Sequence, residues 1–561
     1  MSEEASKLPK DIAAAEGKVN VQINGTWHRF PRGTRIADAC RSVGVPIPCF
    51  CYHPKLAVAG SCRMCMVEQG MPPRLAPGQT PSYDENGYQR IQWMPRPIIS
   101  CANTVAENMG IRTDSPLASE ARRGVMEFLL TSHPLDCPIC DQAGECKLQE
   151  YSNDYGQVEG RFEEKKTKKG KNLSIGPRVN LDPESCVLCG RCVRFMRDIM
   201  HDEVLTMSQR GTFNAITVYP GRELDSNYSM NTVDLCPVGA LTSKDFRFKM
   251  RVWFLKETKT IDVDCGTGTN ITLWTREDKV YRITPRQNDA VNSCWMPDSH
   301  RLNYKYINAE TRIPQPVIRT DAEAVKRIAP NQLAIIASGR MTNEELYMVR
   351  HLAAQIGTDM VDIVPRVGES DGMLISADRN PNTNGARLVL DIEPGSRLDA
   401  IREGVRSGSI KGILSLGEDL ISPEAGFTAE DLDKLDYLFM TAHSANETAR
   451  HADLVLPGVT YAEKFGTMIN VTGRIQRLNR AIQPIGYARD DWQIFRDITL
   501  LLGGNPALKD FNSALDILTA MSTEYGALNG VSWGSIGDGG QPILETGVTI
   551  PVVEREKNQG R

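Results

Sequence analysis

Alternating apolar and polar residues mark the first predicted element of the chain. From residue 18 onward, Val19, Val21 and Ile23 alternate with polar residues, as in a strand with one buried face. The pair Asn24-Gly25 follows, and this dipeptide favours the tight turn of a hairpin. The pattern therefore predicts a β-hairpin near the beginning of the chain.

A helical pattern follows about ninety residues later. Ser115 can cap a helix, and Pro116 suits its first turn because that position needs no backbone N–H. Pro134 stops the helix and leaves His133 at its end. The apolar residues that recur on one face are Val125, Met126, Leu129 and Leu130.

The second half of the chain repeats a strand-helix-strand pattern. A buried strand is predicted at 333–337, and Thr342 with Glu345 forms a capping box for the next helix. Gly357 ends that helix before the apolar run 360–364, and similar runs recur at 410–416 and 437–440. The repeats predict a parallel sheet with helices on both faces. After about residue 505 the pattern weakens, so this tail is expected to be loosely ordered or to wrap neighbours.

Length and composition describe an ordinary globular protein. The chain has 561 residues, of which 41% are apolar and 24% charged, enough for three or four domains. No apolar run approaches the 18 or so residues of a spanning helix, which predicts no direct membrane span. Residues 1–16 resemble neither a secretory signal nor a transit peptide, which favours a bacterial cytosolic location.

The charge of the chain argues against a nucleic-acid partner. The formal net charge is −5, whereas domains that bind nucleic acid are normally basic. The run Lys165 to Lys171 is the exception, and it is interpreted as a solvated loop, with contact to an acidic partner subunit as the alternative.

Fifteen cysteines, all before Trp295, change the picture more than any other residue type. A large chain without a visible secretory signal favours metal sites over disulfides. The chain therefore has a metal-rich half and a half without cysteine.

The first predicted site has the spacing C-x10-C-x2-C followed by a distant cysteine: Cys51, Cys62, Cys65 and Cys101. Its order is similar to that of plant-type two-iron ferredoxins, although their first interval is four residues. Cys40 and Cys49 lie nearby and are interpreted as packing residues, with Cys49 as a competitor of Cys51 for iron.

The second predicted site has the pattern H-x3-C-x2-C-x5-C, formed by His133, Cys137, Cys140 and Cys146. Four ligands would complete a four-iron cluster, and imidazole can replace thiolate on iron, as in Rieske centres. Zinc is the rival metal for three cysteines and a histidine. A lone histidine can also be an ordinary helix-end residue.

The third predicted site joins two distant segments. Cys186, Cys189 and Cys192 form C-x2-C-x2-C, but Met196 stands where a bacterial ferredoxin run has its fourth cysteine. In two-cluster ferredoxins a Cys-Pro cysteine of one run ligates the other cluster, and Cys236-Pro237 supplies such a residue. The remaining ligand positions of the second run carry hydroxyls: Ser226, Ser229 and Thr232. The pattern predicts a two-cluster module that kept one four-iron site and lost the other.

Three strings resemble a known family. Residues 48–54 (PCFCYHP) with 59–65 (AGSCRMC), and residues 133–146 (HPLDCPICDQAGEC), are similar to the large iron-sulfur subunit of proton-pumping NADH:quinone oxidoreductase, respiratory complex I. The resemblance implies a two-iron cluster on the first four cysteines and makes His133 a ligand of the second site. An insertion at 71–97 precedes Cys101 and leaves the path of that loop open. The string at 452–476 resembles the molybdopterin oxidoreductase fold, which this family carries as a vestigial domain.

The resemblance covers residues 18 to about 500 and implies a multidomain α/β and α+β chain. The expected domains are a [2Fe-2S] ferredoxin-like domain (18–112), a His/Cys3 [4Fe-4S] domain (113–157), a ferredoxin-like [4Fe-4S] domain (158–254), a vestigial molybdopterin oxidoreductase-like domain (258–504) and a tail (505–561). The cofactors expected are one [2Fe-2S] cluster and two [4Fe-4S] clusters, with no molybdenum and no flavin on this chain.

The implied function is electron relay within the complex, with no catalytic residue on this chain. Electrons would pass from the FMN- and NADH-binding subunit toward quinone-side iron-sulfur subunits, in the peripheral arm at the cytoplasmic face of the bacterial inner membrane. A molybdenum formate dehydrogenase or an iron hydrogenase is disfavoured because no cysteine follows Cys294. The diaphorase subunit of a soluble NAD-linked hydrogenase would share only the first 240 or so residues, and the long α/β half disfavours it.

One further cluster is expected to be missing. Some members of the family carry C-x2-C-x3-C and a later cysteine at the entrance of the α/β half. The corresponding positions here are Asp262, Cys265, Thr269 and Pro297, so Cys265 and the nearby Cys294 are expected to be packing residues. The pair Gly266 and Gly268 is interpreted as a turn, because it lacks the context of a dinucleotide fingerprint.

Overall fold

A computed structural model describes residues 17–85, 87–320 and 326–558. The expectation for residues 1–16 lies outside the described residues. The chain divides into two compact units, residues 1–252 and 253–561, called here the N-terminal unit and the C-terminal unit. Within the part of the chain that the structure describes, no helix combines the length and apolarity needed to span a membrane.

The N-terminal unit begins with the predicted hairpin. Strands β1 (Lys18–Ile23) and β2 (Thr26–Pro31) pair antiparallel around Asn24 and Gly25, which both have positive φ. The sheet order is β2-β1-β6-β3-β4, with β6 parallel to β1, and α2 (Ile36–Ser42) contributes to the same core. The other strands are β3 (Met66–Met71), β4 (Gln92–Trp93), β5 (Ile98–Ile99) and β6 (Met109–Arg112).

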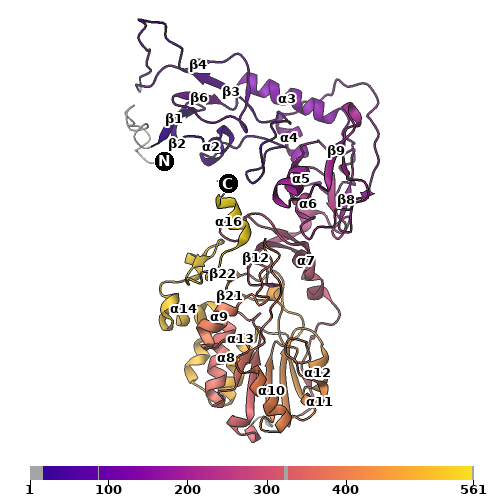
Figure 1. Cartoon of the computed structure of the whole chain (residues 1–561), viewed down its shortest axis with the longest axis vertical. Coiled ribbons are helices and arrows are strands. Elements are labelled where there is room, and N and C mark those ends of the chain that lie inside the picture. The colour runs from indigo at the N-terminus through magenta and orange to yellow at the C-terminus, as the bar shows by residue number, and fades with distance from the viewer. Residues whose placement is uncertain (1–16, 86, 321–325, 559–561) are drawn as a thin grey trace. The chain divides into compact units, whose positions relative to one another are not determined.

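The rest of the N-terminal unit consists of short helices and small sheets (Figure 1). Ser115 accepts a hydrogen bond from the Ala118 N–H and caps α3 (Pro116–Leu130), as predicted. The remaining helices are α4 (Lys147–Tyr155), α5 (Arg191–Arg194), which continues into a π-helical turn (Phe195–Ile199), and α6 (Asn231–Leu235). The strands are β7 (Leu173–Ser174), β8 (Val179–Leu181), β9 (Leu205–Ser208), β10 (Ala215–Val218) and β11 (Leu241–Ser243).

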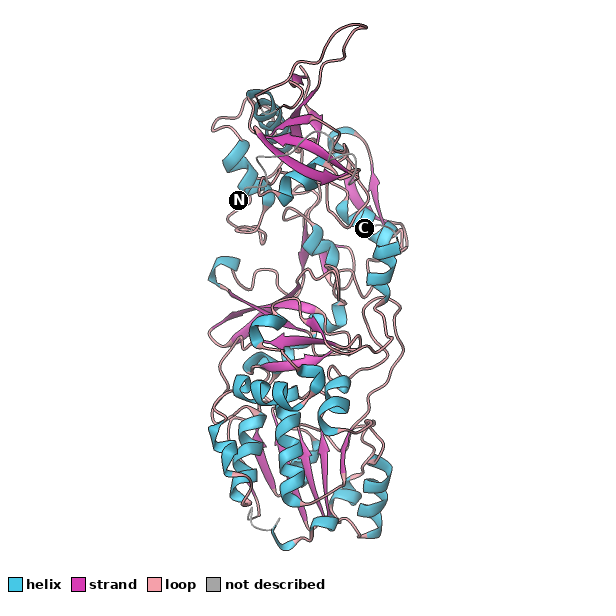
Figure 2. Ribbon diagram, turned by 90° about the vertical axis from the view of Figure 1, so that its left-hand side faces the viewer, coloured by secondary structure: helices cyan, strands magenta, loops and turns pink. Residues whose placement is uncertain are grey.

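The predicted parallel sheet forms the centre of the C-terminal unit. Its order is β15-β20-β19-β18-β16-β17, and all pairs are parallel except that of the edge strand β15. Figure 2 shows helices flanking these strands. The strands are β15 (Val317–Ile318), β16 (Leu333–Ala337), β17 (Val361–Ile363), β18 (Gly412–Leu416), β19 (Tyr437–Ala442) and β20 (Leu454–Pro457).

Strand β16 shows why the strands of this sheet appear in the sequence as continuous apolar runs. Leu333 and Ile335 belong to one hydrophobic core, while Ala334 and Ile336 belong to another on the opposite face. A strand covered on both faces has no polar side. The covering helices are α8 (Asn343–Ile356), α9 (Thr383–Leu390) and α13 (Asp491–Leu501) in the first core, and α10 (Leu398–Ser407) and α11 (Ala429–Leu432) in the second.

The tail is ordered over residues 505–558, so of its two expected states loose order is wrong. Helix α14 (Ala514–Glu524) begins with a capping box at Ser513 and buries Ile517 in the first core. Glu556 of α16 (Pro551–Asn558) accepts a hydrogen bond from the Ser293 hydroxyl at 2.7 Å. The remaining elements are α7 (Asp298–Arg301), α12 (Glu447–His451), α15 (Trp533–Ile536), β12 (Lys256–Ile261), β13 (Asn270–Arg276), β14 (Lys279–Pro285), β21 (Gly466–Ile469), β22 (Arg474–Leu478) and β23 (Gln541–Pro542).

Candidate iron-sulfur sites

The first four predicted ligands lie together in the N-terminal unit. Hydrogen bonds from the thiols of Cys101 and Cys62 lower the pKa of Cys51, although burial opposes the shift. A hydrogen bond from Cys101 likewise lowers the pKa of Cys65 to about 6. The Cys51 backbone N–H also donates to the Cys62 sulfur at 3.4 Å. Four sulfurs in contact, with N–H donors around them, fit the ligand set of a two-iron cluster.

Pairing of β3 with β5 brings the distant Cys101 to this site. Met66 is opposite Ile99 in the ladder, and the Ser100 hydroxyl donates to the Cys65 carbonyl at 2.8 Å. The insertion at 71–97 leaves the sheet at the end of β3 and returns through β4 and β5, which both pair with β3. The loop path is thus fixed by the ladder, and the insertion leaves Cys101 beside Cys65.

The two extra cysteines of this region have other surroundings. Cys40 is part of the hydrophobic core, and burial raises the pKa of its thiol to about 12. The Cys49 thiol donates to the Tyr52 carbonyl at 3.7 Å, and burial raises its pKa. Both cysteines have the surroundings expected of packing residues, and Cys49 also lies within electrostatic reach of Cys51.

The second site is partly brought together. The thiols of Cys137, Cys140 and Cys146 interact electrostatically, and burial raises the pKa of Cys140 and Cys146. His133 is half-buried, and burial with the nearby Lys166 lowers its pKa to about 4, so the imidazole is neutral at pH 7. A neutral imidazole and three thiols are a suitable donor set for a four-iron cluster. The structure records no direct contact between the described His133 ring and these thiols.

The run Lys165 to Lys171 is a loop with exposed and half-buried lysines, and several of these lysines also bind groups of the same unit. The Lys166 ammonium donates to the last carbonyls of α3, at Leu130 and Thr131, immediately before His133. Lys169 donates to the Asn214 carbonyl, and Lys171 pairs with three acids. These contacts fasten the chain around the second site.

The third site is the best defined of the three. The thiols of Cys186, Cys189, Cys192 and Cys236 line one small cavity, although 43 residues separate Cys236 from Cys192. All four have raised pKa values because of burial, and their charges couple to one another. The Leu188 N–H donates to the Cys186 sulfur at 3.3 Å. Four thiols around a cavity fit a four-iron cluster.

The residues of the lost second run bond to the chain itself. The Thr232 hydroxyl donates to the Ser229 carbonyl at 2.7 Å, and the Tyr228 N–H donates to the Ser226 hydroxyl at 3.3 Å. Met196 is fully buried. Local hydrogen bonds of this kind satisfy hydroxyls without a metal.

One apolar core connects the three sites, and sequence reasoning missed it. Cys51, Cys189 and Cys146 belong to the same hydrophobic cluster. The buried Arg194 guanidinium donates to the carbonyls of Cys51 at 2.6 Å and Cys189 at 3.2 Å, so it joins the first site to the third. The N–H of the residue after Cys146 donates to the Pro237 carbonyl, which joins the second site to the third.

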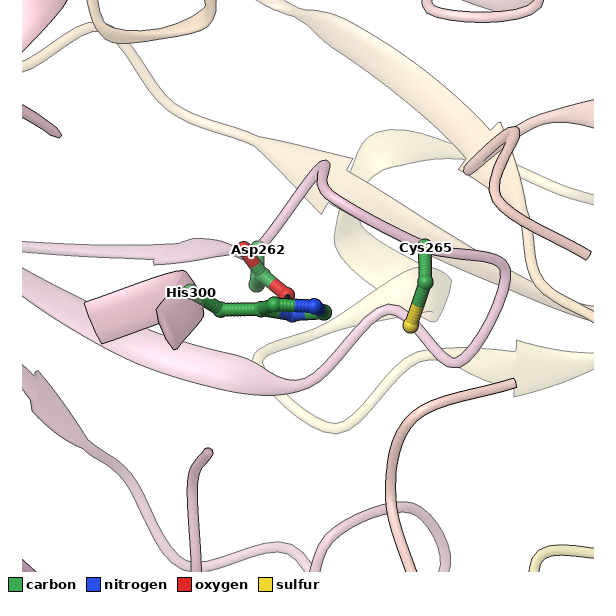
Figure 3. A group of neighbouring side chains, drawn as sticks. All are labelled: Asp262, Cys265 and His300. Carbon is green, nitrogen blue, oxygen red and sulfur yellow. Dashed lines mark hydrogen bonds and ion pairs between the residues drawn. The ribbon is translucent and has the colours of Figure 1, made fainter. Parts of the chain in front are cut away.

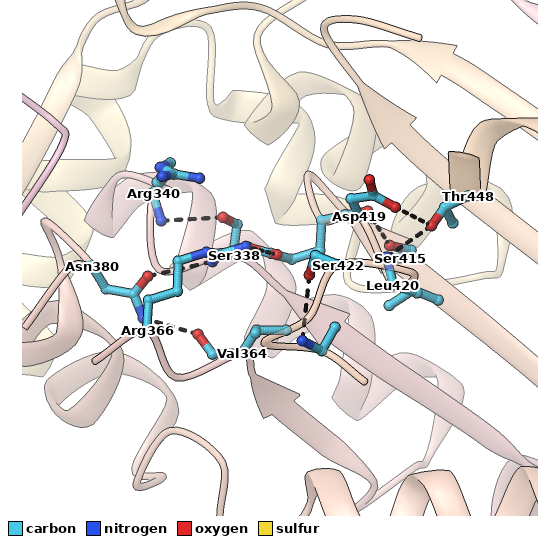
Figure 4. Close-up of polar contacts among 12 residues, drawn as sticks. Ser338, Arg340, Val364, Arg366, Asn380, Ser415, Asp419, Leu420, Ser422 and Thr448 are labelled. Atoms are coloured by element: carbon cyan, nitrogen blue, oxygen red, sulfur yellow. Dashed lines mark hydrogen bonds and ion pairs between the residues drawn. The ribbon is translucent and has the colours of Figure 1, made fainter. Parts of the chain in front are cut away.

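The α/β half has a cavity of about 480 Å³ beside the end of β17, lined by both polar and apolar residues. The two arginines that line it are each paired with a carboxylate. Arg366 donates to Glu418 at 2.9 Å. It also donates to Asn380, which donates to the Val364 carbonyl (Figure 4). Arg387 forms a two-point ion pair with Glu393.

Family models match the chain in the order of these sites. They are a 2Fe-2S iron-sulfur cluster binding domain (16–116), the NADH-ubiquinone oxidoreductase-G iron-sulfur binding region (122–161), the ferredoxin-like domain of NADH-quinone oxidoreductase subunit 3 (176–242), the NADH-ubiquinone oxidoreductase NDSU1/NuoG-like 4Fe-4S domain (255–305) and molybdopterin oxidoreductase (371–499). Fold and sites together define an iron-sulfur electron-transfer subunit joined to a molybdopterin oxidoreductase-like domain.

Relatives extend over most of the chain. The 78 kDa mitochondrial subunit of NADH-ubiquinone oxidoreductase from Neurospora crassa is 30% identical over 89% of this chain and 82% of its own length. The corresponding NADH-quinone oxidoreductase subunit of Rickettsia bellii is 32% identical over 85% of this chain and 70% of its own. The chain belongs to this family, the large iron-sulfur subunit of NADH-quinone oxidoreductase.

A solved structure also matches part of the chain. It is a chain of the NAD⁺-reducing [NiFe]-hydrogenase in the H2-reduced state, which is 26% identical and covers 42% of this chain and 91% of its own length, with a TM-score of 0.34.

Proposed function

We propose that this chain relays electrons through one [2Fe-2S] cluster and two [4Fe-4S] clusters. The two-iron cluster would be held by the first four cysteines, Cys51, Cys62, Cys65 and Cys101. The four-iron clusters would be held by His133 with Cys137, Cys140 and Cys146, and by Cys186, Cys189, Cys192 and Cys236. Such clusters accept and release single electrons. The protein supplies thiolates, N–H donors to sulfur and burial, which tune each potential.

The observation that carries this proposal is the cavity of the third site. Sequence spacing alone selected Cys236 as the partner of three cysteines from another segment, and these four thiols line one cavity. The shared core of the three sites supports a relay, because electron transfer requires short distances between centres.

Two substitutions test whether Cys236 is a ligand of the same cluster as Cys189. Cys236→Ser and Cys189→Ser should both remove the same four-iron signal in paramagnetic resonance of the reduced complex, because each breaks the same cluster. Cys40→Ser is the matched control, since Cys40 is a buried cysteine of the same unit outside the proposed sites. Loss of two different signals in the first two variants would refute the ligand set.

The same proposal places the chain in the peripheral arm of the complex, at the cytoplasmic face of a bacterial inner membrane. Its partners would be the FMN- and NADH-binding subunit and quinone-side iron-sulfur subunits. Three exposed apolar side chains in the segment around the second site, Phe128, Leu135 and Ile139, support contact with a partner chain there. The proposed domain division is 18–112, 113–157, 158–254 and 258–504 with the tail 505–561.

We also propose that the α/β half holds no molybdenum cofactor. Anionic cofactors bind to cationic groups, and the two arginines that line this cavity, Arg366 and Arg387, are paired with Glu418 and Glu393. This supports a scaffold role for the domain.

A further inference from the structure

A compact group of buried donor atoms lies in the C-terminal unit, outside the proposed iron-sulfur sites. Asp262, Cys265 and His300 each offer one donor atom, and these atoms lie within 4.8 Å of one another. All three residues are buried, and the Asp262 Oδ2 lies 2.7 Å from the His300 Nδ1. Figure 3 shows the carboxylate beside the imidazole ring, with the Cys265 sulfur turned toward the same space. Carboxylate, thiol and imidazole are all ligands of transition metals.

The loop that carries two of these donors is held firmly. Residues 262–269 connect β12 to β13, and the Asp262 N–H closes the loop on the Thr269 carbonyl at 2.8 Å. The Gly266 N–H donates to Asp378, and its carbonyl accepts from Val471. Gly268 has positive φ, and a Cβ there would collide with the Gln476 side chain, so the position requires glycine. The donors are therefore positioned before any ion binds.

The Cys265 sulfur has polar neighbours, and its thiol donates to the Leu374 carbonyl at 3.7 Å. The backbone N–H groups of Thr267 and Ser376 donate to it. A structural buried cysteine usually packs as a small apolar side chain. Burial raises the pKa of this thiol to about 11, so a bound metal ion would have to displace its proton.

The position of the group in the fold points to the place of a former cluster. The matching 4Fe-4S family model spans residues 255–305, which contain all three donors but only two cysteines, Cys265 and Cys294. Asp262 and Cys265 stand at the first two positions of the expected cysteine pattern, and His300 lies in α7, three residues after the last. Three mixed donors are too few for a four-iron cluster and enough for one ion.

We propose that Asp262, Cys265 and His300 bind a single zinc-type divalent ion. A set of nitrogen, sulfur and oxygen donors suits zinc, whose bonds to such ligands are about 2.0 to 2.3 Å. Tetrahedral bonds of that length place donors roughly 3.3 to 3.6 Å apart. The Asp262–His300 pair at 2.7 Å therefore has to open, and a pair as far apart as 4.8 Å has to close by about 1.2 to 1.5 Å. Zinc has no redox chemistry, and it would fasten the β12–β13 loop to α7 without taking electrons from the relay.

Metal analysis of the assembled complex tests the site. After washing with a chelator, complexes carrying Cys265→Ser or His300→Gln should each contain one zinc ion fewer per chain than the wild type. Cys294→Ser, in the same segment but outside the group, should keep the full zinc content. Equal zinc in the wild type and Cys265→Ser, or an equal loss in Cys294→Ser, would overturn the proposal.

A measurement on the wild-type complex tests the site without requiring that any variant folds. Anomalous X-ray scattering across the zinc absorption edge should give a peak within bonding distance of the three side chains. The absence of a peak there, or a peak that follows the iron edge instead, would overturn the zinc assignment. These readouts do not depend on the ligands proposed for the three clusters, so either proposal can fail alone.

Discussion

Arg194 offers the sharpest test of coupling between two of the proposed clusters. Its guanidinium is buried and donates to the carbonyls of Cys51, Ala57, Cys189 and Gly190. A cation close to both sites stabilises an added electron on either one. Replacement by methionine, which keeps the apolar stem, should therefore lower both midpoint potentials.

The size of the effect follows from the charge. Two unit charges 4 Å apart interact by about 4 kcal/mol at an effective dielectric constant of 20, and by about 2 kcal/mol at twice that separation. For a one-electron couple, ~2 kcal/mol corresponds to roughly 80 mV. Arg194→Met should thus lower the potentials of the [2Fe-2S] cluster and of the Cys186-to-Cys236 cluster by an amount on the order of 80 mV each.

Redox titration followed by paramagnetic resonance measures both potentials in one sample. Arg194→Lys should shift them much less, because it keeps the charge and loses only the planar fork. Arg251→Met is the matched control, since Arg251 donates to the Cys140 carbonyl at 2.6 Å and should affect only the second site. The charge-coupling argument would be wrong if only one potential moved in Arg194→Met. It would also be wrong if the potentials of Arg194→Lys fell as far as those of Arg194→Met.

Three further outcomes are expected. His133→Ala should lose or convert one four-iron cluster and leave the two-iron signal intact. If Mössbauer spectra of this variant showed the full original cluster set, His133 would be an ordinary helix-end residue. The purified chain should contain about ten irons and no molybdenum, whereas about 14 irons would indicate a working cluster in the α/β half. Lys464→Met should lower the free energy of unfolding by about 3 to 5 kcal/mol, because the buried Glu345 carboxylate loses the cation that binds it at 2.7 Å. Denaturant unfolding measures this, with no comparable loss expected for Lys411→Met, which breaks an exposed pair.

Local patterns in the sequence were sufficient for much of the fold. The hairpin around Asn24 and Gly25, the capped start of α3 and the bounds of β16 all agree with the structure. Each depends on short-range chemistry, such as a dipeptide with positive φ, a cap, or a run of apolar residues. The prediction of a loosely ordered tail beyond residue 505 was wrong because it also relied on short-range patterns alone. Its helix α14 is stabilised by packing into a core formed by distant segments, which local periodicity does not report.

For the candidate sites, the sequence by itself determined which residues can be ligands. Cysteine spacing separated three groups, and the Cys-Pro signal paired Cys236 with a segment far from it. Only the tertiary structure decided what surrounds those groups. Arg194 joins two sites through carbonyls, and His300 meets Cys265 although 34 residues separate them along the chain. Hydrogen bonds to backbone carbonyls leave no side-chain pattern, and a mixed donor set has no fixed spacing. Both arise when packing brings separate segments of the chain together.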